Sequence, residues 1–286
     1  MYSTYNNFLC IKNIDRDTLD LDKTFDCGQC FRWRKLPDGT WIGVVADKIF
    51  MLKHKNIDGV DCIITTATQE EWENILYKYL DLDTDYSKLT VPDGDTFAIE
   101  AMQAGKGIRI LRQDAWESII SFIISQRNNI PKIKSTIKKL CEEYGNEIEI
   151  EVNGEVYKEY TFPTAERLAE CKLVDIKSIG LGYRDIYILM AAKDVVDGRI
   201  SIDKLINCTN ADCIIEELKS MVGVGPKVAN CIALFGLHKL ETFPIDVWMQ
   251  RIIDTEYDGH LDYKVYGSLA GLLQQYMFYY MKYKKS

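Results

Sequence analysis

The chain has 286 residues, of which 47% are hydrophobic, and a formal net charge of −8 at pH 7. That length can bury a core shared by two or three subdomains, while the negative charge argues against a protein that binds nucleic acid indiscriminately. No apolar run approaches the roughly 18 residues that span a bilayer, and the first residues lack the basic start and apolar centre of a secretory signal. We therefore expect a protein of the cytoplasm or another reducing compartment, which is not secreted and does not bind membranes.

Residues 1–105 are expected to form a β-rich, antiparallel N-terminal domain. Short apolar stretches separated by tight turns predict consecutive strands at 31–36, 41–46, 49–55 and 61–68. The turn between the first two is Pro37-Asp38-Gly39, and an amphipathic helix is expected over 69–82.

Residues 106–286 are expected to form a helical body. Apolar residues recur there with the spacing of amphipathic helices, over 114–125, 131–145, 183–198, 211–220, 226–236, 246–254 and 266–281. Residues 146–162 interrupt this pattern, because they alternate around Asn153-Gly154 and so predict an inserted β-hairpin. The predicted fold class is α+β.

Residues 221–248 carry the most specific pattern. Gly223 and Gly225 precede a predicted helix with Lys227 in its first turn, and Asp246 follows in Pro244-Ile245-Asp246. Glycines permit close backbone approach, and the N–H groups that begin a helix can bind a DNA phosphate. A helix-hairpin-helix is thus expected at about 211–236, with a catalytic loop at 237–248. The alternative is a solvated lysine and an aspartate that only caps a helix.

Helical spacing predicts a pocket next to the lysine. Lys227, Cys231 and Phe235 are separated by four residues each, so they share one helix face, and Gln274 and Phe278 share another. Together they would form a slot for a planar heterocycle. The alternative is that Cys231, Phe235 and Phe278 are ordinary core residues.

The nine cysteines are irregularly spaced, which suits a reducing compartment better than a disulfide framework. Cys27 and Cys30 form a CxxC pair, but no second CxxC or CxxH completes a zinc site. No cysteine follows Cys231, so we expect no iron–sulfur cluster after Asp246.

Five separated motifs resemble, in order, those of the 8-oxoguanine DNA glycosylase/AP lyases of the helix-hairpin-helix superfamily. They are GQCFRW (28–33), SFIISQRNNI (121–130), GLGYRDIYI (180–188), GVGPKVANCI (223–232) with PIDV (244–247), and YGSLAGLLQQYMF (266–278). The resemblance implies a TBP-like N-terminal domain and double-stranded DNA containing 8-oxoguanine as the partner of a monomer. It also implies excision of the base, followed by cleavage of the strand.

The resemblance also implies the roles of the pocket residues. Lys227 would attack C1′ and form a Schiff base, while Asp246 would stabilise positive charge on the sugar. Cys231 and Phe278 would sandwich the flipped base, and Gln274 would bond its pyrimidine edge. A carbonyl at Gly28 would accept a hydrogen bond from N7–H, which guanine lacks. Phe235 stands where the family has a smaller pocket residue.

The resemblance assigns reading of the opposite base to two segments. One holds Asn128 and Asn129; the other holds a wedge, Tyr183, and a cytosine contact, Arg184. Two departures are evident in the first segment. Arg127 replaces the first asparagine of the family's triplet, and Lys132 replaces an arginine that helps to read cytosine. Since lysine lacks the planar fork of arginine, part of the preference for cytosine is expected to be missing.

The remaining contacts implied are to phosphate and to a cation. Gly223 and Gly225 would offer backbone groups to a DNA phosphate, next to Trp248, which replaces a phosphate-contacting histidine. Backbone carbonyls near Lys219, Met221 and Val224 would hold a monovalent or similar cation, and no other cofactor is expected.

A basic segment within 106–139 is expected to face DNA, with eight basic residues against Asp114 and Glu117. The basic residues are Lys106, Arg109, Arg112, Arg127, Lys132, Lys134, Lys138 and Lys139. Two other functions stay open at this point: an alkylpurine glycosylase that uses Asp246 alone, and a non-catalytic helix-hairpin-helix DNA-binding protein.

Overall fold

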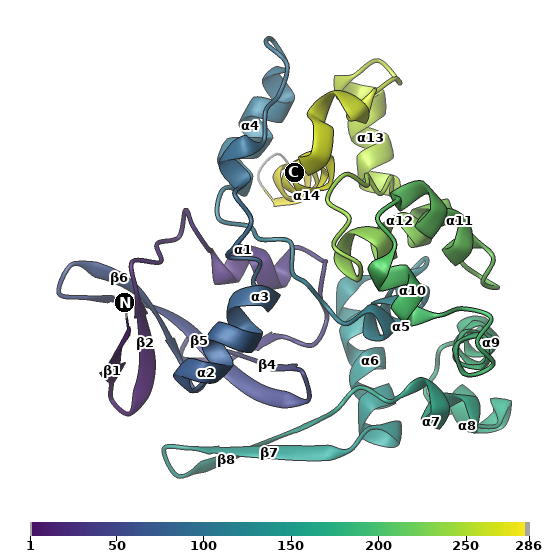
Figure 1. Cartoon of the computed structure of the whole chain (residues 1–286), viewed down its shortest axis with the longest axis horizontal. Coiled ribbons are helices and arrows are strands. Elements are labelled where there is room, and N and C mark those ends of the chain that lie inside the picture. Colours follow the sequence, from purple (N-terminus) through teal and green to yellow (C-terminus); the bar gives the residue numbers. More distant parts are fainter. Residues whose placement is uncertain (1, 284–286) are drawn as a thin grey trace.

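The computed structural model describes residues 2–283; residue 1 and the last three residues of the predicted helical body lie outside that range. Figure 1 shows a twisted sheet on one side and a group of helices on the other, with the C-terminal helix near the top. No helix in the described range is long and apolar enough to cross a membrane.

The N-terminal sheet has six strands in the order β1-β2-β6-β5-β4-β3, and every neighbouring pair is antiparallel. The strands are Tyr2–Tyr5 (β1), Phe8–Lys12 (β2), Arg34–Lys35 (β3), Trp41–Val45 (β4), Lys48–Ile57 (β5) and Val60–Thr65 (β6). The predicted antiparallel domain is therefore confirmed.

Two details of the sheet differ from the sequence prediction. The β1–β2 hairpin was not expected, because its turn uses Asn6 and Asn7 at positive φ instead of a glycine. Only Arg34–Lys35 of the strand expected over 31–36 pairs with a neighbour. The residues before it leave the sheet because Phe31 and Trp33 pack into two different cores.

Both faces of the sheet are covered. Trp41, Phe50 and Leu52 point to one face, where they pack on α1 (Leu21–Asp26) and on the helix expected over 69–82. That helix is built from α2 (Gln69–Glu71), a π-helical segment (Trp72–Leu76) and α3 (Tyr77–Tyr79).

The inserted hairpin covers the other face of the sheet. Its strands are β7 (Glu147–Val152) and β8 (Glu155–Tyr160), joined at Asn153-Gly154 as predicted. Ile148 and Ile150 pack with Ile42 and Met51 of the sheet, while the glutamates that alternate with them stay exposed. In Figure 1 the hairpin runs beneath the sheet.

The helical body follows the predicted periodicity. Its helices are α4 (Thr96–Gly105), α5 (Ala115–Ser125), α6 (Ile130–Tyr144), α7 (Ala165–Ala169), α8 (Leu173–Lys177), α9 (Arg184–Val196), α10 (Ile202–Asn207), α11 (Ala211–Lys219), α12 (Pro226–Phe235), α13 (Val247–Glu256) and α14 (Ala270–Tyr283). Short 3₁₀ segments occur at Tyr86–Lys88 and Tyr263–Leu269. The last helix starts later than expected, since Gly267 has a φ of 66°.

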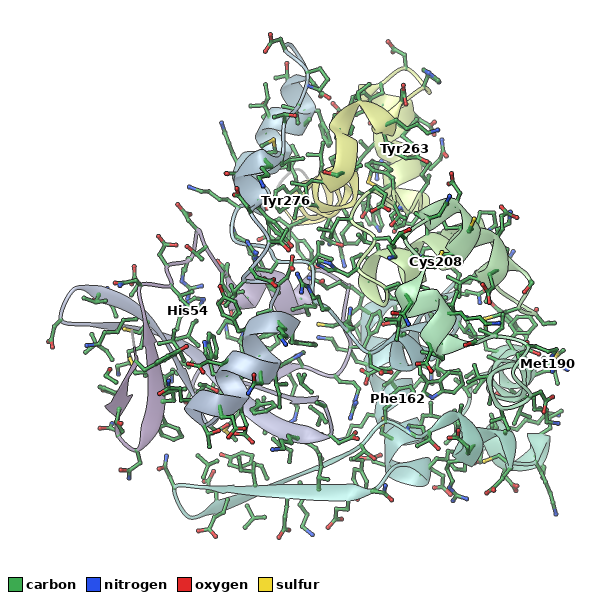
Figure 2. All side chains as sticks on the ribbon, viewed as in Figure 1. His54, Phe162, Met190, Cys208, Tyr263 and Tyr276 are labelled. Carbon is green, nitrogen blue, oxygen red and sulfur yellow. The ribbon has the colours of Figure 1, made fainter. Side chains whose placement is uncertain are left out.

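The C-terminal helix α14 packs against α4. Tyr276, labelled in Figure 2, lies so close to Gly105 that a Cβ there would come within 2.4 Å of its ring. Residues from both ends of the body therefore share one core. The domain boundary near residue 105 stays a prediction.

An ion pair joins the sheet to the helical body. Arg32 Nη1 lies 2.7 Å from a carboxylate oxygen of Glu117 on α5, and the same guanidinium donates to the Tyr160 carbonyl of β8. Burial raises the pKa of Glu117, and the nearby Arg32 opposes that rise. The pair is thus a fixed contact between sheet, hairpin and body.

Candidate active site

The helix-hairpin-helix consists of α11, a turn at residues 220–225, and α12. Gly223 has a φ of 85°, and a Cβ there would come within 2.4 Å of the Tyr187 ring, so both backbone and space require glycine. Gly225 caps α12 and Pro226 starts it, which leaves the first N–H groups of the helix without helical partners. This end of α12 can therefore accept an anion.

One small cavity of about 60 Å³ brings the predicted pocket residues together. The two helix faces deduced from spacing both line it. Its lining comprises Lys227, Cys231 and Phe235 of α12, Gln274, Gln275 and Phe278 of α14, and Cys27, Gly28, Phe122, Pro244 and Asp246.

Asp246 has both roles that the sequence left open. Its Oδ1 accepts a hydrogen bond of 2.9 Å from the backbone N–H of Met249, so it caps α13. It also lines the cavity with Lys227. A capping carboxylate is held rigidly by its helix, and here that rigidity orients it toward the pocket.

Aromatic and sulfur groups form the walls next to Lys227. The Lys227 ammonium lies 5.8 Å from the centre of the Phe122 ring, and Phe122 stacks on Phe235 with centres 5.4 Å apart. Burial raises the pKa of the Cys231 thiol, and the nearby Lys227 opposes this only in part. Cys231 is therefore a neutral thiol at pH 7 and can contact a flat aromatic face.

Two polar groups can read a base in this cavity. Gln274 is only 5% exposed, and its Oε1 has no hydrogen-bond partner among the described residues. A buried amide oxygen without a partner is costly unless a ligand satisfies it. The second group is the backbone at Gly28, whose φ is 86° and where an added Cβ would lie 3.8 Å from the Phe278 ring. A side chain at Gly28 would be strained and would crowd Ile130.

A larger groove of about 960 Å³ opens from the cavity. It runs between the segment before α6 and the starts of α12 and α13. Residues predicted to contact DNA line it: Arg127, Asn128, Asn129, Gly225 and Trp248. Lys282 of α14 lines it as well, with its ammonium 5.4 Å from the Phe278 ring centre.

The segments assigned to the opposite base meet at Gln126, which the sequence analysis did not single out. The Gln126 carbonyl accepts a hydrogen bond of 3.0 Å from Arg184 Nε, and its side-chain amide donates to the Gly223 carbonyl at 2.9 Å. The Tyr183 ring is half exposed and stacks on the Arg184 guanidinium at 4.5 Å. Only a three-dimensional structure could identify Gln126, because its partners are distant in sequence.

Three other residues predicted to read the opposite base lie just before α6 or in its first turn, and only two of them line the groove. Asn128 donates to the Ile124 carbonyl at 3.3 Å, and Asn129 caps α6 by accepting from the Lys132 N–H at 3.0 Å. The Lys132 side chain is exposed and is not part of the groove lining.

The expectation that the whole basic segment faces DNA is wrong for two arginines. Arg109 is buried and stacks on Tyr86 at 3.7 Å. Arg112 pairs with the fully buried carboxylate of Asp81 at 2.7 Å, and also with Asp83. Acidic partners distant in sequence neutralise Arg112, which the local charge count could not reveal.

The hairpin turn leaves carbonyls where a cation was expected. Its closing backbone bonds run to the carbonyls of Leu218 and Met221, and leave those of Lys219 and Val224 for another partner. Carbonyl oxygens are ligands for hard cations. Among the described residues no group of three or more His, Cys, Asp or Glu could hold a metal ion.

The CxxC pair is part of the core. Cys27 and Cys30 are both buried, and their thiols donate to the carbonyls of Thr24 and Phe25. Burial raises the pKa of Cys27 to about 12, so it has almost no thiolate character near neutral pH.

Two family models match most of the chain. Residues 11–119 match the model described as 8-oxoguanine DNA glycosylase, N-terminal domain. Residues 120–257 match the HhH-GPD superfamily base excision DNA repair protein model.

Similar proteins agree with these matches. The N-glycosylase/DNA lyase of Saccharomyces cerevisiae is 30% identical over 85% of this chain and 70% of its own length. The structure of MBOgg1 with a low-affinity DNA ligand is 35% identical, with a TM-score of 0.87, over 100% of this chain and 99% of the other. The Clostridium acetobutylicum 8-oxoguanine glycosylase/lyase, in complex with dsDNA containing cytosine opposite 8-oxoG, is 32% identical with a TM-score of 0.85, over the same shares.

The electrostatics of Cys231 lead to a testable prediction. Its raised pKa means that the thiolate forms only at alkaline pH, so iodoacetamide should modify Cys231 far more slowly than the exposed Cys213 at pH 7.5. Mass spectrometry of the native protein measures both rates, with Cys213 as the internal control. Equal rates at the two cysteines would show that Cys231 is an exposed or ionised thiol.

Proposed function

The chain belongs to the 8-oxoguanine DNA glycosylase family, and from that premise we propose that it excises 8-oxoguanine from duplex DNA and then cleaves the strand. The observation that supports this most strongly is the cavity that Lys227 and Asp246 line together, with flat walls from Phe278 and Phe235. The test is excision and strand cleavage on a duplex with one 8-oxoguanine.

Lys227 is proposed as the nucleophile. Its amine attacks C1′ as the bond from C1′ to the base breaks, and the base leaves with the bonding electrons and takes up a proton. The nitrogen of the adduct then loses a proton and expels the ring oxygen O4′, which takes up a proton, so that the sugar opens to a Schiff base. Removal of a proton from C2′ then drives β-elimination, which breaks the bond from C3′ to the phosphate oxygen. The amine must first be deprotonated, and Phe122 and Cys231 give it a partly dry environment.

Asp246 is proposed to stabilise the positive charge that develops on the sugar. A carboxylate fixed by a helix cap needs little reorganisation as that charge develops, which is the basis of electrostatic catalysis. Its place beside Lys227 in the cavity lining supports this role.

The base itself is proposed to lie between Cys231 and Phe278. Gln274 supplies an unpartnered amide oxygen for the pyrimidine edge. The Gly28 carbonyl would accept from N7–H of 8-oxoguanine but face the N7 lone pair of guanine. Such a mismatch costs on the order of 1–3 kcal/mol. The base must leave the helix to reach this pocket.

The two alternative functions fit the site less well. An alkylpurine glycosylase that uses Asp246 alone needs no lysine, whereas Lys227 lines the cavity. A non-catalytic binding module needs no cavity beside the hairpin. Arg127, Asn128, Asn129, Tyr183 and Arg184 remain proposed readers of the opposite strand.

We further propose a monomer that acts in the cytoplasm and needs no cofactor beyond a cation at the hairpin. One chain supplies the whole cavity lining, and all nine cysteines are unpaired, as in a reducing compartment. The carbonyls of Lys219 and Val224 would hold the cation, together with the second lone pair of the Met221 carbonyl, which already accepts from the Val224 N–H. The cation would neutralise charge near a phosphate bound by Gly223 and Gly225.

Lys227→Gln should abolish the covalent adduct trapped by borohydride and leave lesion binding largely intact, because glutamine keeps most of the side chain's bulk without a nucleophilic amine. Trapping on gels and binding by fluorescence anisotropy give the two readouts. Undiminished trapping would show that another amine is the nucleophile.

Asp246→Asn should lower single-turnover excision by about 100-fold or more, with little effect on binding, because the lost charge matters mainly in the transition state. Asparagine caps a helix about as well as aspartate, so thermal stability should change little. Normal excision by this variant would mean that Asp246 is only a cap.

Excision opposite adenine, thymine and guanine should occur at rates closer to the cytosine pair than in relatives with arginine at the position of Lys132. A lysine ammonium is a mobile point charge and cannot present the fixed donors that distinguish cytosine. Single-turnover excision from the four duplexes measures the preference.

Lys132→Arg should restore part of the preference for cytosine in the same assay, and Lys138→Arg on the exposed side of α6 is the matched control. If the unaltered protein already rejects the other three pairs strongly, Lys132 does not determine the preference.

A further inference from the structure

We propose that Gln275 and Tyr283 are positioning residues that fix the lesion-reading carbonyl of Gly28. This inference rests on the proposed function and concerns how the protein distinguishes 8-oxoguanine from guanine. It follows from hydrogen bonds between the C-terminal helix α14 and the end of α1.

The carbonyls just before Gly28 are the free ends of a helix. Helix α1 ends at Asp26, and Cys27 is its C-cap, so their carbonyls have no partner within the helix. Helix α14 supplies both donors. Gln275 Nε2 donates to the Cys27 carbonyl at 3.0 Å, and the Tyr283 hydroxyl donates to the Asp26 carbonyl at 2.9 Å.

The residue after Gly28 is fixed independently. Gln29 is fully buried, and its side-chain amide donates to the carbonyls of Thr24 and Arg109 at 3.0 and 2.8 Å. Its own carbonyl accepts from Gln113 at 2.8 Å. The peptides on both sides of Gly28 are therefore fixed. The Gly28 carbonyl accepts none of these bonds.

One helix thus carries both sides of the recognition site. Gln274, Gln275 and Phe278 line the cavity, and Gln275 also holds, together with Tyr283, the loop that bears Gly28. The bonds from Gln275 and Tyr283 tie the loop to the helix that carries Phe278, so together with the bonds of Gln29 they fix the position of the Gly28 carbonyl relative to the Phe278 wall. Gly28 has no side chain to restrict its own rotation, so without them its carbonyl can turn away from the base.

The consequence is specific to the edge of the base at N7. A carbonyl that can rotate loses part of its hydrogen bond to N7–H and also avoids the lone pair of guanine. Losing either donor should therefore reduce discrimination more than it reduces binding to DNA in general. A residue that only stabilises the fold would lower both affinities together.

The test measures the ratio of dissociation constants for guanine and 8-oxoguanine duplexes, each opposite cytosine, in the Lys227→Gln background. Gln275→Met and Tyr283→Phe remove one donor each and keep the bulk of the side chain. Each should reduce the ratio on the order of fivefold, the usual value of one hydrogen bond. Tyr280→Phe is the matched control, since its hydroxyl bonds Glu100 of α4 and not the loop that bears Gly28.

A second readout uses a duplex that already contains an abasic site. Strand cleavage there needs Lys227 but no base, and Tyr283 is not part of the cavity lining, so Tyr283→Phe with Lys227 retained should cleave it at the normal rate. An unchanged ratio in both variants, or an equal loss of affinity for both duplexes, would overturn the inference. If Gln275→Met does not fold, Tyr283→Phe alone decides. If the unaltered protein neither excises nor prefers 8-oxoguanine, the proposed function fails first and the inference fails with it.

Discussion

The packing of α14 across the helical body is the contact on which the site depends. Its outer face lies against α4, where Tyr276 fills the space that Gly105 leaves open. Its inner face places Gln274 and Phe278 opposite Lys227 and Cys231 of α12. Because the pocket forms between these two helices, a shift of either one would change its width. The last helix of the chain therefore completes a site that begins at Gly28.

The groove carries basic groups although the protein as a whole is acidic. The chain has a net charge of −8, and Asp81 and Asp83 hold Arg112 away from the groove. The basic groups left beside the groove include Arg127 and Lys282. Such an arrangement favours contact with phosphate at one place over general attraction to nucleic acid. The helix start at Gly225 adds an anion site that needs no charged side chain.

Helical periodicity was enough to predict the two faces that meet at the cavity, because spacing within a helix is a local property. Strand-like alternation around the turn residues Asn153-Gly154 likewise predicted the inserted hairpin. The contacts of Gln126, Gln275 and Phe122 could not be predicted, since each joins elements distant in the sequence. The β1–β2 hairpin was missed for a different reason: two asparagines adopt the positive φ values that glycine usually signals.

The central claim is that the amine at Lys227 performs the chemistry in this cavity. The most direct measurement is to trap the protein with borohydride on a duplex containing 8-oxoguanine, digest the complex, and identify the modified residue by mass spectrometry. The account predicts a single modified position, Lys227. Modification of Lys282, the other lysine that lines the groove, would contradict it.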